Sequence, residues 1–168
     1  CKFIQVYGLT ETCGAGTILE PEDHDPSLGR LRSCGKVAPT AELKIVDSKG
    51  NSLGPNEVGE ITYRSKSVMK GYWKNEEATQ KSISSGWFST GDAGYLDADG
   101  YLYIHDRIKD MIVSGGENVY PAEVENALFD HPAIGDVAVI GVPDDKWGEA
   151  VKAVVVLKPG TCLLYTSP

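Results

Sequence analysis

The sequence lacks the features that mark proteins with a general affinity for nucleic acid. Its 16 Lys and Arg residues are outnumbered by 24 Asp and Glu residues, which gives a formal net charge of −8. A chain with this balance has no broad basic surface to neutralise a phosphate backbone, so general nucleic-acid binding is disfavoured. A phosphate group would have to be bound at a local site, by a few side chains or backbone N–H groups.

Cysteines are few and long apolar runs are missing. The four cysteines, Cys1, Cys13, Cys34 and Cys162, form no C-x-x-C pair and stand apart from the three histidines. This pattern argues against a zinc site or a disulfide framework and is typical of reduced thiols in a cytoplasmic protein. Apolar runs such as 153–157 are far short of the ~20 residues that a membrane span needs. We therefore expect neither a transmembrane segment nor a signal peptide.

What is present fits a globular protein. The 168 residues are 41% hydrophobic and 24% charged, enough for one average domain or two small ones. The chain begins at Cys1 and runs directly into a motif-like stretch. We therefore expect it to be an internal piece of a longer protein.

Apolar and polar residues alternate over 37–47 and 59–65, which predicts half-buried strands. A third pairing is predicted over 94–106, where residues 97–100 supply the turn of a tight hairpin. Residues 18–36 mix prolines, glycines and charges, as in an irregular surface loop. This part of the chain suggests a small antiparallel barrel or sheet.

A different pattern follows Arg107. The predicted elements are a strand over 110–114, a Gly-Gly break, a helix over 121–131 and strands over 134–142 and 149–157. This order indicates a compact α+β lobe. We place the boundary between the two parts near residues 108–110.

Three short motifs carry residue types suited to nucleotide chemistry. YGLTET (7–12) puts a glycine beside an aromatic ring and adds a hydroxyl for phosphate and a carboxylate for Mg²⁺. STGDAGY (89–95) offers Asp92 for ribose hydroxyls, with Arg107 further along the chain. KDMIVSGGEN (109–118) has adjacent glycines whose N–H groups suit an anion or a narrow ligand. Taken singly, each motif is more often a structural turn.

The motifs occur together in one order, and with their neighbours they carry a resemblance. YGLTET, GEITYRSKSVMKGYW, GWFSTGDAGYLDADGYLYIHDRIKDMIVSGGENVYPAEVE and GVPDDKWGEAVKAVVVL resemble the acyl-adenylate-forming (AMP-binding) enzymes. That superfamily includes acyl-CoA synthetases, adenylation domains of peptide synthetases and beetle luciferases. The resemblance covers residues 5–160. Residues 114–125 and 143–157 are most similar to bacterial-type fatty-acid or aryl-acid CoA ligases.

The resemblance implies a mixed α/β fold in two parts. Residues 1–107 would be the C-terminal part of the AMP-binding domain and would contain an antiparallel barrel-like subdomain. Residues 108–160 would be a truncated, mobile α+β C-terminal lobe. The apolar tail 161–168 has no periodicity, and we expect it to be non-native.

The resemblance also implies an activity with ATP, Mg²⁺ and coenzyme A. Such enzymes join a carboxylic acid, fatty or aromatic, to AMP with release of pyrophosphate, and the thiol of coenzyme A then displaces AMP. Two alternatives stay open: a peptide-synthetase-type adenylation domain that loads a carrier protein, and a non-catalytic nucleotide-binding module.

The same resemblance assigns roles to the first motif. Tyr7 would lie along the adenine, and Gly8 would let the ring come close. Thr10 would donate a hydrogen bond to the α-phosphate, and Glu11 would ligate Mg²⁺.

The later motifs receive roles in the same way. Asp92 and Arg107 would bind the ribose. Lys109 would be the hinge about which the C-terminal lobe rotates between half-reactions. The residues that would line the pantetheine tunnel are Ser114, Gly115 and Gly116.

Two features of the family are missing from these residues. They are the Ser/Thr/Gly-rich phosphate loop and the lysine of a P-x-x-x-x-G-K stretch that neutralises charge during adenylation. We therefore expect the isolated chain to be catalytically inactive.

Overall fold

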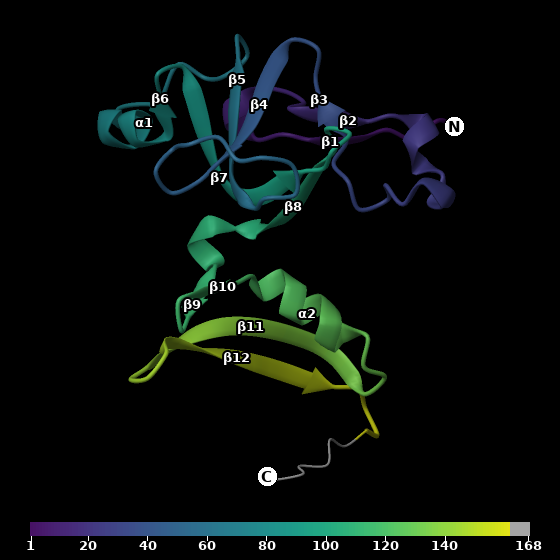
Figure 1. Ribbon diagram of the computed structural model, residues 1–168. Coiled ribbons are helices and arrows are strands. Elements are labelled where there is room, and N and C mark those ends of the chain that lie inside the picture. Colours follow the sequence, from purple (N-terminus) through teal and green to yellow (C-terminus); the bar gives the residue numbers. More distant parts are fainter. Residues whose placement is uncertain (162–168) are drawn as a thin grey trace. The chain divides into compact units, whose positions relative to one another are not determined.

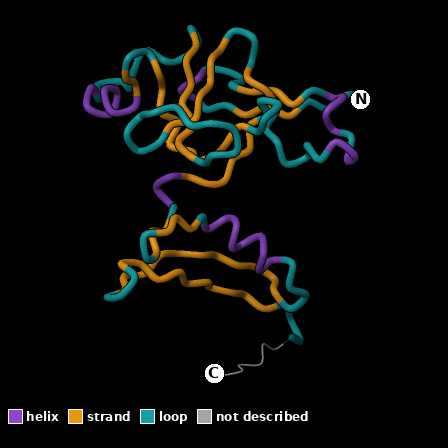
Figure 2. Tube along the Cα trace, viewed as in Figure 1, coloured by secondary structure: helices purple, strands orange, loops and turns teal. Residues whose placement is uncertain are grey.

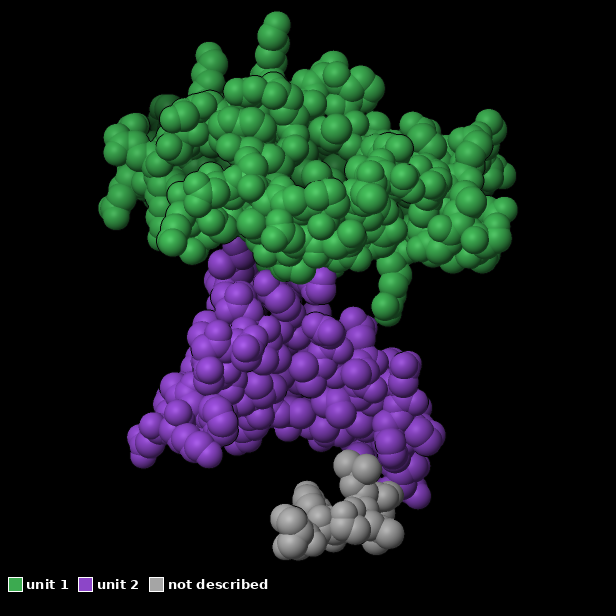
Figure 3. Space-filling view, in the orientation of Figure 1, with its two compact units in different colours: residues 1–104 green, residues 105–168 purple. Residues whose placement is uncertain are grey.

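The computed structural model describes residues 1–161 and divides into two compact units, which Figure 3 distinguishes by colour. Unit 1 spans residues 1–104, and unit 2 begins at His105. Figures 1 and 2 show that strands dominate both units and that helices are few. Within residues 1–161 the strands form three sheets with antiparallel pairing, which confirms the predicted mixed α/β class built on antiparallel sheets.

Unit 1 begins with a small sheet in the order β1-β2-β3. Its strands are β1 (Gln5–Tyr7), β2 (Thr17–Leu19) and β3 (Lys36–Val37). The loop between β1 and β2 contains the 3₁₀ turn η1 (Thr10–Thr12). The predicted loop 18–36 is irregular apart from the end of β2, the first residue of β3 and two 3₁₀ turns, η2 (Pro21–His24) and η3 (Pro26–Leu28). Each of these turns begins at a proline, whose fixed φ suits a first helical position.

The larger sheet of unit 1 has the order β4-β5-β7-β6, with β8, whose last three residues belong to unit 2, also paired to β7. Its strands are β4 (Ala41–Val46), β5 (Gly59–Ser65), β6 (Ile83–Ser84), β7 (Trp87–Leu96) and β8 (Leu102–Arg107). Ile45, Ile61 and Leu102 form the buried centre of the core. The predicted strand over 59–65 and the hairpin turn at 97–100 are confirmed, whereas the strand predicted over 37–47 is shorter and covers Ala41–Val46.

The sequence did not predict helix α1 (Glu76–Ser82) or the first half of β7. The helix has no fully buried residue, so it lacks the apolar stripe that marks most helices. It is capped locally, because the Asn75 side chain accepts a hydrogen bond from the Ala78 amide at 3.0 Å.

Unit 2 is the predicted α+β lobe, with a sheet in the order β10-β9-β12-β11. Its elements are η4 (Ile108–Asp110), β9 (Ile112–Ser114), β10 (Glu117–Val119), α2 (Pro121–Phe129), β11 (Ile134–Asp144) and β12 (Gly148–Leu157). Helix α2 packs on β11, and the buried apolar residues include Ile112, Ile134 and Val139.

The Gly-Gly break proved to be the turn of a hairpin between β9 and β10. Ser114 pairs with Glu117, and the two glycines between them have φ values of +60° and +89°. A two-residue turn with both φ values positive suits the twist of a hairpin and favours glycine. Strand β10 is too short to show a period, which is why the sequence did not predict it.

In residues 1–161, no helix is long and apolar enough to cross a membrane. The expectation of a non-native tail concerns residues that, apart from Thr161, lie outside the described part of the chain.

Candidate functional site

The YGLTET motif forms a tightly bonded turn between β1 and β2. The Gly16 amide donates to the Tyr7 carbonyl oxygen at 2.7 Å, which closes the loop. The buried Thr12 hydroxyl lies 2.8 Å from the carbonyl oxygen of Leu9. A Cβ on Gly8 would lie 2.2 Å from the Gly14 carbonyl oxygen, so only glycine fits this position without a shift. These contacts fix the turn that presents Thr10 and Glu11.

Glu11 is also held from outside its own turn. The Tyr72 hydroxyl donates to Glu11 Oε1 at 2.9 Å, and the Met69 amide donates to the Glu11 carbonyl oxygen at 2.7 Å. Burial, and then the bond to Glu11, raises the pKa of the Tyr72 hydroxyl. Tyr72 therefore remains protonated, and a donor, at neutral pH. Sequence reasoning gave it no role, although it lies in one of the stretches that carried the resemblance.

Asp92 is presented by a bulge in β7. The register between β5 and β7 shifts opposite Ile61, so residues 90–92 leave the regular ladder. Gly91 has a φ of +74° at this point. The buried Thr90 hydroxyl donates to the Ile61 carbonyl oxygen at 2.7 Å and accepts from the Asp92 amide at 3.1 Å. Bulges of this kind redirect side chains and are frequent beside active sites.

The structure brings Asp92 and Tyr7 into contact from positions far apart in the sequence. The Tyr7 hydroxyl donates to Asp92 Oδ2 at 2.8 Å, and Asp92 is only 7% exposed. Burial, reinforced by the bond to Asp92, raises the pKa of Tyr7 well above its usual range. The tyrosine thus stays a donor to the carboxylate at neutral pH. The two residues belong to different sheets, so this contact links the first motif to the second.

The remaining predicted residues belong to unit 2. Arg107 is the last residue of β8, and Lys109 is an exposed residue of η4. The turn formed by Ser114, Gly115 and Gly116 packs on the β11–β12 turn. There the Gly115 amide donates to the Trp147 carbonyl oxygen at 2.9 Å, and a Cβ on Gly115 would lie 2.6 Å from the Trp147 ring. Unit 1 thus carries the first part of the predicted site, and unit 2 carries the rest.

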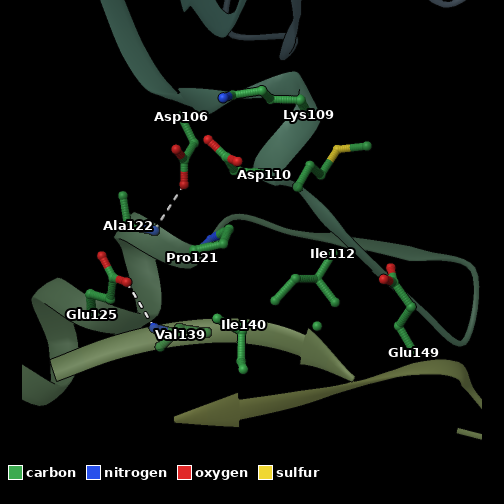
Figure 4. A pocket seen from close by; sticks show the side chains of 12 residues that line it. Asp106, Lys109, Asp110, Ile112, Pro121, Ala122, Glu125, Val139, Ile140 and Glu149 are labelled. Carbon is green, nitrogen blue, oxygen red and sulfur yellow. Dashed lines mark hydrogen bonds between the residues drawn. The ribbon is translucent and has the colours of Figure 1, made fainter. Parts of the chain in front are cut away.

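Lys109 lines a pocket of about 490 Å³ in unit 2 (Figure 4). Three acids of its wall accept hydrogen bonds from backbone amides. Glu125 Oε1 accepts from Val139 at 2.8 Å and Asp106 Oδ2 accepts from Ala122 at 2.9 Å. Likewise, Glu149 Oε2 accepts from the Val113 amide at 2.8 Å. These bonds join β8 to α2, α2 to β11 and β12 to β9, so the carboxylates contribute to the packing of unit 2.

The residues of unit 1 fit a magnesium ion that is bound together with a nucleotide. Mg²⁺ prefers hard oxygen ligands and usually takes one or two carboxylates, substrate phosphates and waters. Glu11 supplies one such carboxylate, beside the hydroxyl of Thr10. No group of three or more His, Cys, Asp or Glu in the described residues could hold a metal ion by itself. A metal here would therefore depend on the phosphates of its substrate.

Comparison with known proteins identifies the family. The profile described as AMP-binding enzyme matches residues 1–73, and that of the AMP-binding enzyme C-terminal domain matches residues 123–166. The chain belongs to the AMP-binding enzyme family. The first match includes the turn that carries Thr10 and Glu11, and the second covers most of helix α2 and both long strands of unit 2.

Two curated members of the AMP-binding enzyme family are similar over most of the chain. The fatty acid–[acyl-carrier-protein] ligase ScoC of Streptomyces coeruleorubidus is 45% identical over 160 residues, 95% of this chain and 31% of that protein. The 2-succinylbenzoate–CoA ligase of Bacillus velezensis is 49% identical over 153 residues, 91% of this chain and 31% of that protein. The chain thus spans about a third of the length of these relatives.

Solved structures of the family share the fold. The o-succinylbenzoate CoA synthetase MenE of Bacillus subtilis, in complex with the acyl-adenylate intermediate OSB-AMP, matches with a TM-score of 0.85 at 45% identity. The match covers 95% of this chain and 32% of that one. A structure of the same synthetase with ATP and a magnesium ion matches with a TM-score of 0.81 at 45% identity, over 92% of this chain and 31% of that one.

Proposed function

We propose that this chain is part of an ATP- and Mg²⁺-dependent ligase that activates a carboxylic acid as acyl-AMP and transfers the acyl group to coenzyme A. The observation that carries the proposal is the contact between Tyr7 and Asp92, which joins the two nucleotide motifs in a member of the AMP-binding enzyme family.

Residues of unit 1 hold the nucleotide in this proposal. Asp92 accepts hydrogen bonds from the ribose hydroxyls, and Tyr7, which donates to the same carboxylate, lies along the adenine. The Gly8 backbone comes close to the base. Thr10 donates a hydrogen bond to the α-phosphate, next to the carboxylate of Glu11. Fixed donors of this kind stabilise the charge that develops on phosphate oxygens when the carboxylate attacks the α-phosphorus and pyrophosphate leaves.

Glu11 holds the magnesium ion in this proposal. When bound, the ion neutralises phosphate charge and makes the α-phosphorus more electrophilic. The chain's own contribution is to fix the carboxylate: the η1 turn sets its position, and the bond from Tyr72 sets the orientation of Oε1.

Arg107 contacts the same ribose as Asp92. The residues that follow it serve the second half-reaction: Lys109 is the hinge between the two domains, and the Ser114–Gly116 turn lines the tunnel for pantetheine. We accordingly propose that residues 1–107 belong to the AMP-binding domain and 108–160 to its C-terminal domain. A cytoplasmic location, expected from the scattered cysteines, stays a prediction.

Pyrophosphate exchange by the complete protein that contains this chain tests the proposal. With ATP, Mg²⁺ and a panel of fatty and aromatic acids, we expect acid-dependent exchange of labelled pyrophosphate into ATP. Adding coenzyme A should then release AMP and form a thioester. Absence of exchange with every acid, together with absence of AMP binding in calorimetry, would favour a non-catalytic module instead.

A carrier protein is the second candidate acceptor. One of the similar relatives is named as a ligase for an acyl carrier protein. A carrier protein presents a phosphopantetheine thiol in place of free coenzyme A. Both acceptors present the same reacting thiol. Offering coenzyme A and a phosphopantetheinylated carrier protein to the acyl-AMP complex, and comparing the rates of thioester formation, decides between them.

The isolated 168-residue chain should form no acyl-CoA, because it lacks the phosphate loop and the P-x-x-x-x-G-K lysine of the family. Assay of the purified chain with ATP, Mg²⁺, coenzyme A and the acid that the complete protein uses checks this prediction. Measurable product above a blank without protein would contradict it.

A further inference from the structure

Two segments far apart in the sequence meet at Glu11. Its turn lies between β1 and β2, whereas Met69 and Tyr72 lie in the connection that follows β5. This connection holds the backbone of Glu11 through the Met69 amide and its carboxylate through the Tyr72 hydroxyl, at 2.7 and 2.9 Å. Both the main chain and the side chain of Glu11 therefore take part in this contact.

The backbone of the loop that carries Tyr72 is held by its neighbours. The Tyr72 amide donates to the Thr79 hydroxyl at 2.9 Å, and that hydroxyl donates to the Asn75 carbonyl oxygen at 2.8 Å. Gly71, with a φ of +154°, packs so closely that a Cβ there would lie 2.8 Å from the Thr79 methyl carbon. Helix α1, which carries Thr79, thus anchors the loop that places the Tyr72 hydroxyl.

We propose that Tyr72 is a positioning residue for the metal: its hydroxyl fixes one oxygen of the Glu11 carboxylate and so orients the other toward a divalent cation. This inference rests on the proposed function of Glu11. A glutamate has three rotatable side-chain bonds, and ordering them costs conformational entropy when the cation binds. A hydrogen bond made beforehand removes part of that cost, which is the benefit of preorganisation.

The bond also leaves the negative charge in place. A protonated tyrosine donates to the carboxylate without neutralising it, whereas a lysine or arginine at this position would compete with the cation. Tyr72 is therefore expected to act on metal binding and to leave metal-independent binding of AMP unaffected.

Tyr72→Phe in the complete protein tests the proposal, because it removes the hydroxyl and keeps the ring. Tyr101→Phe is the matched control: the Tyr101 hydroxyl donates to a carboxylate oxygen of Asp23 at 2.8 Å, in another part of unit 1. We expect Tyr72→Phe to raise the Mg²⁺ concentration for half-maximal pyrophosphate exchange about three- to tenfold, as the loss of one hydrogen bond would. Tyr101→Phe should leave it unchanged.

Binding gives a second readout that does not depend on catalysis. Electron paramagnetic resonance of Mn²⁺ with a non-hydrolysable ATP analogue should give a similar three- to tenfold weaker Mn²⁺ affinity for Tyr72→Phe, while AMP affinity in calorimetry stays the same. An unchanged metal requirement, or an equal loss of AMP affinity, would overturn the proposal. If the wild-type protein showed no exchange, the proposed function would fail, and the Mn²⁺ titration would still decide the role of Tyr72.

Discussion

The acids of the two nucleotide motifs in unit 1 and the acids of the pocket in unit 2 are held in different ways. In unit 1, Asp92 and Glu11 accept hydrogen bonds from tyrosine hydroxyls, at 2.8 and 2.9 Å. In unit 2, the acids of the pocket accept from backbone amides: Asp106 from Ala122, Glu125 from Val139 and Glu149 from Val113. A carboxylate thus has two uses in this chain. In unit 1 a tyrosine hydroxyl orients the carboxylate, whereas in unit 2 the carboxylate serves as the hydrogen-bond partner of a backbone amide.

The difference separates function from stability. A backbone N–H left unpaired in a protein interior costs about 1–3 kcal/mol, so an acid that bonds one contributes to folding. The bonds from Tyr7 to Asp92 and from Tyr72 to Glu11 join two side chains, so they fix the carboxylates without completing a backbone ladder. Substitutions of Asp92 and Glu11 should therefore weaken nucleotide use, whereas substitutions of the pocket acids in unit 2 should weaken local stability.

The largest effect should come from Asp92→Ala in the complete protein. Losing two charge-assisted hydrogen bonds to the ribose should lower the efficiency of pyrophosphate exchange about 100-fold. Asp99→Ala, an exposed acid on the β7–β8 hairpin, is the control and should stay near wild type. Steady-state exchange kinetics with varied ATP measure both. Similar losses for the two variants would mean that unit 1 does not use Asp92 as a ligand.

A second prediction concerns Lys109, an exposed residue that the proposal makes a hinge. Lys109→Pro fixes φ at this position and should slow thioester formation by roughly tenfold or more, with little change in pyrophosphate exchange. Lys109→Ala keeps the backbone free and should affect neither step strongly. Single-turnover transfer from preformed acyl-AMP to coenzyme A separates the two steps. Equal damage to both half-reactions by the proline variant would exclude the hinge.

The sequence predicted the elements whose signals are local. The strands over 59–65, 134–142 and 149–157, the helix beginning at Pro121 and the hairpin turn at 97–100 all follow from periodicity or turn chemistry. Helix α1 carries no apolar stripe, and its sequence therefore gave no signal. The bulge that presents Asp92 breaks the alternation of β7, which hid the first half of that strand.

The contacts within the site were beyond sequence reasoning. The motifs and the resemblance pointed to Tyr7 and Asp92 separately, but the hydrogen bond between them depends on how two sheets pack. No local sequence pattern predicts the bond from Tyr72 to Glu11, because Glu11 lies in another turn of the fold. Residue types and order indicate chemistry, whereas the pairing of side chains requires the tertiary structure.

The smallest expected effect is on stability in unit 2. Glu125→Ala leaves the amide of the buried Val139 without its 2.8 Å partner and should destabilise β11 locally by about 1 kcal/mol. Hydrogen exchange of the β11 peptide in the complete protein should then be about fivefold faster. Glu125→Gln keeps an acceptor oxygen and should restore most of the protection, while pyrophosphate exchange stays at the wild-type rate in both variants. A loss of nucleotide use without faster hydrogen exchange would contradict a structural role for Glu125, because Glu125 would then behave like Asp92 and Glu11.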